Sequence, residues 1–135
     1  MFAGVLKNLG TKRAFIVHGA DGLDEATVTG ETRVSELKEG LINTYNLNPV
    51  DFFGEVYDAG ALAGGSPAEN AVITRNILAG KDGAGRKIVL LNAALAIMAG
   101  GKAGNVREGI DLAAECIDNG AALQKLDALI AATRV

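Results

Sequence analysis

Three carboxylates gather directly after a short apolar run near the start of the chain. Residues 14–17 are apolar, His18 ends the run, and Asp21, Asp24 and Glu25 follow with glycines between them. Carboxylate oxygens are the protein ligands that Mg²⁺ takes, and the ion shares the rest of its shell with water and phosphate. The acidic loop is therefore a candidate metal site, and the alternative is a solvated acidic turn.

Asp24 and Glu25 are adjacent in the sequence, and adjacent side chains usually point apart. The pair can therefore hold two ions, or one ion with the second contact made through water. His18 carries the side chain that titrates nearest neutrality, which makes it a candidate general base. The alternative for His18 is a structural hydrogen bond.

The elements that position the acidic loop are predicted to be strands. Residues 14–17 are too few for a helix and rich in β-favouring types, so we expect a strand buried on both faces, as in a parallel sheet. Ligands bind beyond the carboxyl ends of such strands. Residues 26–29 predict a second strand, and residues 32–47 predict a hairpin that turns at 38–40.

Signals for helix starts dominate the second half of the chain. Ser66 with Glu69, and Asn105 with Glu108, have the spacing of capping boxes, in which two side chains bond to each other's backbone amides. Glycines follow the apolar segments and predict where the helices end. The predicted helices cover residues 2–9, 67–79, 86–99, 106–118 and the stretch after Gly120, and residues 51–65 are expected to form a loop.

The segment 86–99 is apolar nearly all round, and Asn92 is the exception. We expect a buried central helix there. A buried amide must find hydrogen-bond partners, so Asn92 is expected to bond to a neighbouring loop. In the last helix, we expect four apolar residues to face the core: Leu123, Leu126, Leu129 and Ile130.

The composition limits the classes of function. The 135 residues are enough for one domain, and a net charge of −3 with 4% aromatic residues argues against a nucleic-acid partner. The uncharged run 88–101 is too short to cross a bilayer, and the N-terminus lacks the order of a signal peptide. The lone Cys116 excludes an internal disulfide and a cysteine-cluster metal site. We expect a soluble cytoplasmic protein.

Four motifs follow one another along nearly the whole chain. They are His18-Gly19-x-Asp21-Gly22-Leu23-Asp24-Glu25, Gly65-Ser-Pro-Ala-Glu-Asn70-Ala, Leu90-Leu-Asn92-Ala-Ala-Leu95 and Asn119-Gly120-Ala-Ala-Leu123-x-Lys125-Leu126. In these motifs, their order and their spacing, the chain resembles the C-terminal half of the anthranilate phosphoribosyltransferase family.

The resemblance implies an α/β fold, with a partial, mostly parallel sheet and a β-hairpin in the first half and a helical cluster in the second. Residues 1–135 would form a single domain, a C-terminal fragment of the phosphoribosyltransferase α/β domain. The implied reaction transfers a phosphoribosyl group from phosphoribosyl pyrophosphate to anthranilate in tryptophan biosynthesis, in a homodimeric parent enzyme. By the same correspondence Asp24 and Glu25 bind the Mg²⁺ that accompanies phosphoribosyl pyrophosphate, with Asp21 behind them.

Other parts of the family's site have no counterpart in the sequence. In the family a glycine-rich loop ending in Gly-Gly-Asp, a Lys-His-Gly-Asn segment and an anthranilate-facing arginine lie upstream, and Gly64-Gly65 is no substitute because Ser66 follows. We therefore expect an N-terminal half to be missing and the chain alone to be inactive. Two alternatives stay open: a nucleic-acid-binding paralogue that has lost catalysis, and a nucleoside phosphorylase of similar fold. The net charge opposes the first, and the Asp24-Glu25 loop opposes the second.

Overall fold

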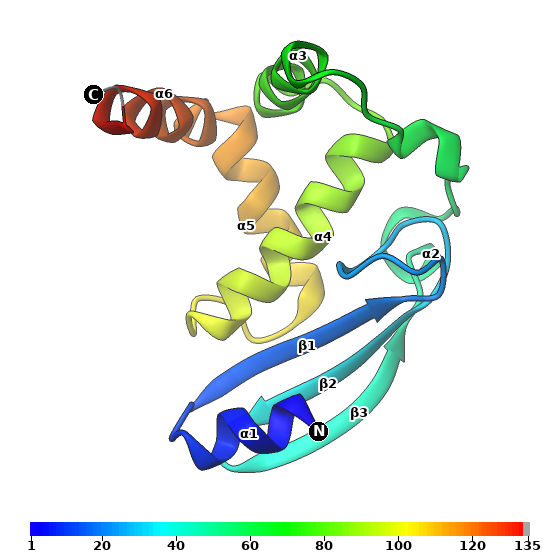
Figure 1. Cartoon of the computed structure of the whole chain (residues 1–135), viewed down its shortest axis with the longest axis vertical. Coiled ribbons are helices and arrows are strands. Elements are labelled where there is room, and N and C mark those ends of the chain that lie inside the picture. Colours follow the sequence, from blue (N-terminus) through cyan, green and yellow to red (C-terminus); the bar gives the residue numbers. More distant parts are fainter. Residues whose placement is uncertain (134–135) are drawn as a thin grey trace.

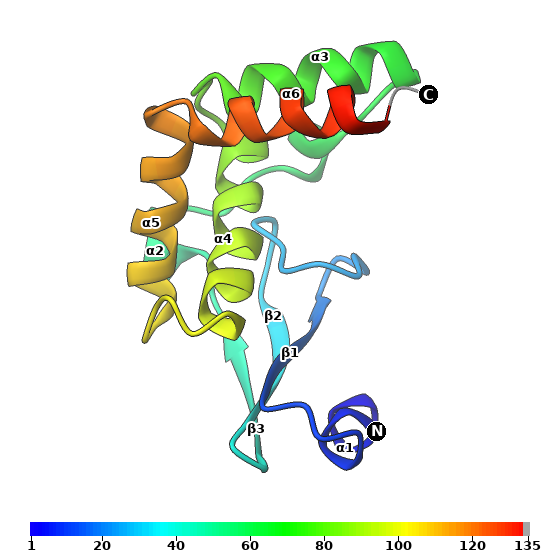
Figure 2. The same ribbon diagram turned by 90° about the vertical axis from the view of Figure 1, so that its left-hand side faces the viewer.

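A computed structural model describes residues 1–133, with a small sheet at one end and a group of helices at the other (Figure 1). Figure 2 shows α3 and α6 lying side by side at the end away from the sheet. The elements in chain order are α1 (Phe2–Asn8), β1 (Arg13–Gly19), β2 (Thr32–Lys38), β3 (Leu41–Leu47), α2 (Val50–Phe53), the 3-10 helix η1 (Ala59–Leu62), α3 (Pro67–Leu78), α4 (Ala84–Ala99), α5 (Val106–Asp118) and α6 (Ala121–Thr133). The expected α/β class, with a hairpin followed by helices, is confirmed.

The sheet is antiparallel, which corrects the expectation of a mostly parallel one. β1 pairs with β2 from Arg13 opposite Lys38 to Gly19 opposite Thr32, and β2 pairs with β3 in the same antiparallel sense. Parallel neighbours need a crossover, usually a helix, and the segment between β1 and β2 forms none. β1 is accordingly half-buried along most of its length instead of being covered on both faces.

Residues 26–29 do not form the predicted second strand. Two of their amides bond to side chains: the Thr27 N–H donates to Thr32 Oγ1 at 2.9 Å, and the Thr29 N–H donates to Thr27 Oγ1 at 3.1 Å. The Val28 carbonyl accepts the Tyr57 N–H at 2.9 Å, outside any strand pairing. Residues 26–28 are nevertheless fully buried. The β-branched side chains fill the core from a loop, which is why the pattern was misleading.

The predicted hairpin is present as β2 and β3. Glu39 and Gly40 form its turn with φ of 49° and 81°. Two central residues with positive φ suit the right-handed twist of the flanking strands, and glycine adopts this conformation without a steric cost.

The core is built around α4, which begins at Ala84, two residues before the predicted start. Leu91 on α4 is 0% exposed. α5 approaches α4 closely, because a Cβ placed on Gly109 would lie 2.9 Å from the Cα of Ala94. Within residues 1–133, no helix combines the length and the apolar character needed to cross a membrane.

The two predicted capping boxes differ in outcome. Ser66 and Glu69 form the complete box at the start of α3. Asn105 caps α5 by accepting the Glu108 N–H at 3.0 Å, but the Glu108 carboxylate accepts from Gly104 at 2.8 Å instead of from Asn105. Only half of the second box therefore forms.

The last helix is less buried than its pattern predicts. No residue of α6 is buried, and Leu129 is 59% exposed, while the other three residues expected to turn inward are only partly covered. The segment 51–65 is also more ordered than the expected loop, since it contains η1 and most of α2. Asp58 caps η1 by accepting the Gly60 N–H at 2.7 Å.

Candidate metal-binding loop and its adjoining hollow

Asp21 closes the loop between β1 and β2. Its carboxylate accepts hydrogen bonds from Thr27 Oγ1 at 2.6 Å, from Thr29 Oγ1 at 2.5 Å and from the Leu23 N–H at 3.1 Å. Burial raises the pKa of Asp21, but these hydrogen bonds together outweigh it and lower the pKa below the ordinary value of 3.8. Asp21 is therefore ionised near neutral pH, and its carboxylate stabilises the loop through these hydrogen bonds.

Asp24 and Glu25 are the free carboxylates of this loop. Both are exposed, and within residues 1–133 neither takes part in an ion pair or a side-chain hydrogen bond. In the same range no three His, Cys, Asp or Glu side chains come together as a metal cage. Two reachable carboxylates leave the other coordination positions to water and a ligand, which is the way Mg²⁺ is usually bound. The donor set fits this ion, and metal binding here stays a prediction.

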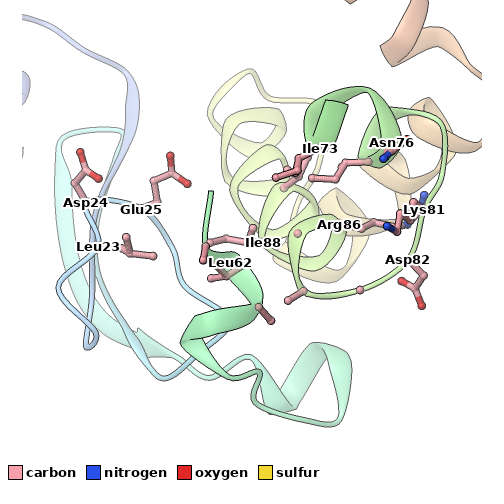
Figure 3. Close-up of a pocket in the computed structure, with 17 residues that line it drawn as sticks. Leu23, Asp24, Glu25, Leu62, Ile73, Asn76, Lys81, Asp82, Arg86 and Ile88 are labelled. Atoms are coloured by element: carbon pink, nitrogen blue, oxygen red, sulfur yellow. The ribbon is translucent and has the colours of Figure 1, made fainter. Parts of the chain in front are cut away.

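A hollow of about 650 Å³ opens beside the two carboxylates. Figure 3 shows Asp24 and Glu25 on one side of it and Asn76, Lys81 and Arg86 on the other. Its lining consists of residues 23–25, 61–63, 81–86, 88 and 89, with Ile73, Asn76 and Ile77. This volume lies within the range of small-molecule sites.

The far side of the hollow carries the cations Lys81 and Arg86 together with the carboxylate of Asp82, which is paired with Lys87. Arg86 is 9% exposed and forms an ion pair of 2.8 Å with Asp118, which ties the start of α4 to the end of α5. Its Nη1 is buried and has no hydrogen-bond partner in the described part of the chain. Lys81 is exposed, so it is the cation that a ligand in the hollow would meet.

The glycines before α3 lead into a helix end that is already occupied by an anion. Glu69 Oε2 accepts the Ser66 N–H at 2.7 Å and the Ser66 hydroxyl at 2.6 Å. Asn70 Oδ1 accepts the Gly65 N–H at 2.8 Å. A phosphate at this helix N-terminus would have to displace the carboxylate of Glu69.

His18 lies apart from the hollow. It is exposed on β1, opposite Arg33 in the register with β2, and it is absent from the lining of the hollow. The hollow therefore gives no support to the general-base hypothesis, and both interpretations of His18 stay predictions.

Asn92 forms the bond to a neighbouring loop that was predicted for it. Its Oδ1 accepts the Ala26 N–H at 2.9 Å, and its Nδ2 donates to the Ala26 carbonyl at 2.7 Å. Sequence reasoning missed the role of Arg86 and the hydroxyl partners of Asp21. The hydroxyl groups of Thr27 and Thr29 could have indicated partners for Asp21, but both residues were interpreted as part of a strand.

Comparison with known proteins assigns the chain to a family. Residues 1–123 match the family model described as "Glycosyl transferase family, a/b domain". The anthranilate phosphoribosyltransferase of Desulfosudis oleivorans is 49% identical over 135 residues, which cover 99% of this chain and 40% of that protein.

Solved structures agree with the family match. The anthranilate phosphoribosyltransferase of Thermus thermophilus is 35% identical with a TM-score of 0.85, covering 96% of this chain and 38% of that one. The enzyme of that name from Saccharomyces cerevisiae, in complex with PRPP and Mg, is 31% identical with a TM-score of 0.75, covering 85% and 33%. The chain thus spans at most 40% of the length of these three proteins. Because the family model matches most of its residues, the chain belongs to the glycosyl transferase family that shares this a/b domain.

Proposed function

We propose that this chain supplies the metal-binding part of an anthranilate phosphoribosyltransferase. The proposed reaction transfers a phosphoribosyl group from phosphoribosyl pyrophosphate to anthranilate, in tryptophan biosynthesis. The observation that carries the proposal is the exposed, unpaired pair Asp24 and Glu25 beside a ligand-sized hollow. The names of the similar proteins support it, and one of those structures holds PRPP and Mg. The two alternatives, a nucleic-acid-binding paralogue and a nucleoside phosphorylase, gain no support.

In this proposal Asp24 and Glu25 hold and orient Mg²⁺. The metal, when bound, neutralises charge on the pyrophosphate leaving group. Asp21 keeps the loop closed behind the two ligands through its hydrogen bonds from Thr27 and Thr29. The phosphate-binding and anthranilate-facing groups lie outside these 135 residues, so transfer needs further protein, which we take to be an N-terminal half in a homodimeric enzyme. The lone thiol of Cys116 suits the cytoplasmic setting of this role.

The test uses a chimaera in which this chain replaces the matching segment of the Desulfosudis oleivorans enzyme, which is 49% identical to it. Replacing both Asp24 and Glu25 by alanine should lower kcat/KM by about 10²–10³-fold, because charge stabilisation of the leaving group is lost. The decrease of anthranilate fluorescence measures turnover. Raising the Mg²⁺ concentration should restore activity only in part, since the ligands themselves are gone.

The matched control removes two carboxylates from a surface outside the hollow. Asp111 and Glu115 are exposed on α5 and do not line the hollow, so alanine at both positions should leave activity and its Mg²⁺ dependence unchanged. If the curves of activity against Mg²⁺ superimpose for the parent chimaera and the Asp24/Glu25 double variant, the pair does not bind the metal.

A further inference from the structure

The two candidate metal ligands lie on a segment that is fixed at both ends. Before them, the Leu23 carbonyl accepts the Gly19 N–H at 2.9 Å. After them, Ala26 is bonded to Asn92 through both its N–H and its carbonyl, at 2.9 Å and 2.7 Å. Only Asp24 and Glu25 lie between these two attachments, with their side chains exposed.

Asn92 connects this segment to the central helix. Its Nδ2 also donates to the Ile88 carbonyl at 2.9 Å, one turn earlier in α4. The orientation of the amide is therefore set by the helix, and the amide in turn sets the position of the Ala26 backbone. A primary amide is the side chain that offers a donor and an acceptor together, so an apolar residue of similar size would leave both groups of Ala26 unsatisfied.

The two hydrogen bonds between Asn92 and Ala26 hold the segment in place because Ala26 is buried. Ala26 and the following Thr27 are 0% exposed, and buried backbone groups require partners. Without Asn92, we expect the backbone at Ala26 to shift so that its N–H and carbonyl can form hydrogen bonds with water. The exposed neighbours Asp24 and Glu25 offer no packing that would resist this movement.

We propose that Asn92 is the positioning residue of the metal site, which fixes Asp24 and Glu25 against α4 at the edge of the hollow. This inference rests on the proposed function, because it presumes that the two carboxylates bind a divalent cation. Supporting residues that orient metal ligands typically change metal affinity by about 10–100-fold when they are removed. Asn92 should act in this way through the backbone of Ala26.

The experiment uses the 135-residue chain labelled with ¹⁵N and Mn²⁺ as the probe. In the wild type, Mn²⁺ should broaden the amide signals of residues 24–26 selectively. In Asn92→Leu the Mn²⁺ concentration for half-broadening should rise about tenfold or more. Amide hydrogen exchange without metal should become faster at Ala26 in the same variant. Asn92→Asp keeps the acceptor for the Ala26 N–H but sets a carboxylate against two carbonyls, so it should shift both readouts in the same direction if the leucine variant does not fold.

A destabilised control separates positioning from general loss of stability. Ile117→Val removes a methylene from a buried site on α5 and should leave Mn²⁺ broadening unchanged. If the Asn92 variants bind Mn²⁺ as the wild type does, the inference on Asn92 is overturned and the proposed function stands. If the wild type shows no selective broadening at 24–26 and resembles an Asp24→Ala, Glu25→Ala variant, the metal assignment of the proposed function fails, and the positioning role fails with it.

Discussion

Glu69 stabilises the start of α3 most strongly when it is ionised. Hydrogen bonds from the hydroxyl and the amide of Ser66 lower its pKa below the ordinary value of 4.5. Because the folded state lowers this pKa, the stabilisation is complete above that value and is lost as the pH falls through the lowered pKa. Glu69→Gln keeps an acceptor oxygen but does not titrate.

We therefore expect the wild type to be more stable than Glu69→Gln at neutral pH, since a charged acceptor is the stronger one at a helix N-terminus. The difference between their free energies of unfolding should vanish in acid, as measured by urea unfolding over a pH series. A difference that stays constant across the series would show that the ionised carboxylate is not what matters.

Individual residues of the candidate site stood out in the sequence where their chemistry demands a residue type. Asp24 and Glu25 stood out as carboxylates among glycines, and Asn92 stood out as an amide in an apolar helix that must find partners. The bonds of Asp21 were missed although Thr27 and Thr29 are hydroxyl residues close by in the sequence, because the bonds depend on a loop whose backbone turns to bring these residues to Asp21. Sequence spacing does not show where such a loop turns.

The contact between α4 and α5 depends on a missing side chain at Gly109. An added Cβ would lie 2.9 Å from the Cα, Cβ and O of Ala94, and backbone atoms cannot move aside as a flexible side chain can. Alanine gains about 1 kcal/mol of helix propensity, but overpacking costs about 1–3 kcal/mol. Because the clash is with backbone atoms, we expect an overpacking cost of about 2–3 kcal/mol, so Gly109→Ala should lower the free energy of unfolding by about 1–2 kcal/mol in urea titrations.

Gly4 in α1 provides the matched control for this prediction. A Cβ at Gly4 would meet no atom within 4 Å, so Gly4→Ala should be neutral or slightly stabilising. If Gly109→Ala behaves like Gly4→Ala, the two helices are free to separate and the close approach does not determine stability.

Helices were predicted better than strands, for a physical reason. Caps and glycines are local signals, and they placed α3 and α5 within a residue or so of their observed ends. The direction of β1 relative to β2 depends on how the intervening loop folds back, which the alternation of side chains does not encode. Residues 26–29 show the same limit, because burial in a loop and burial in a strand select the same β-branched residues.

The buried core of the molecule is concentrated in its middle elements. α4 and α5 carry most of the buried side chains, with Val34 and Leu37 contributed by β2. α3 and α6 have no buried residue, and apolar side chains are exposed on α1 and β3, such as Phe2 at 72% and Leu41 at 70%. The loop that carries Asp24 and Glu25 is attached to the well-packed part, through Asn92 on α4.

This distribution bears on what the chain can do by itself. It holds a supported pair of carboxylates, but under the proposed function the groups that bind the phosphates and face anthranilate lie elsewhere. Holding two reactants in register contributes about 7–11 kcal/mol to lowering a barrier, and most of that is absent here. We expect the purified chain to cause no decrease of anthranilate fluorescence with phosphoribosyl pyrophosphate and Mg²⁺, under conditions in which the chimaera is active.

Expression in a host that lacks its own anthranilate phosphoribosyltransferase removes the obvious contaminant. Turnover that persists in such preparations and disappears when Asp24 and Glu25 are both replaced by alanine would show that the 135 residues contain a complete active site.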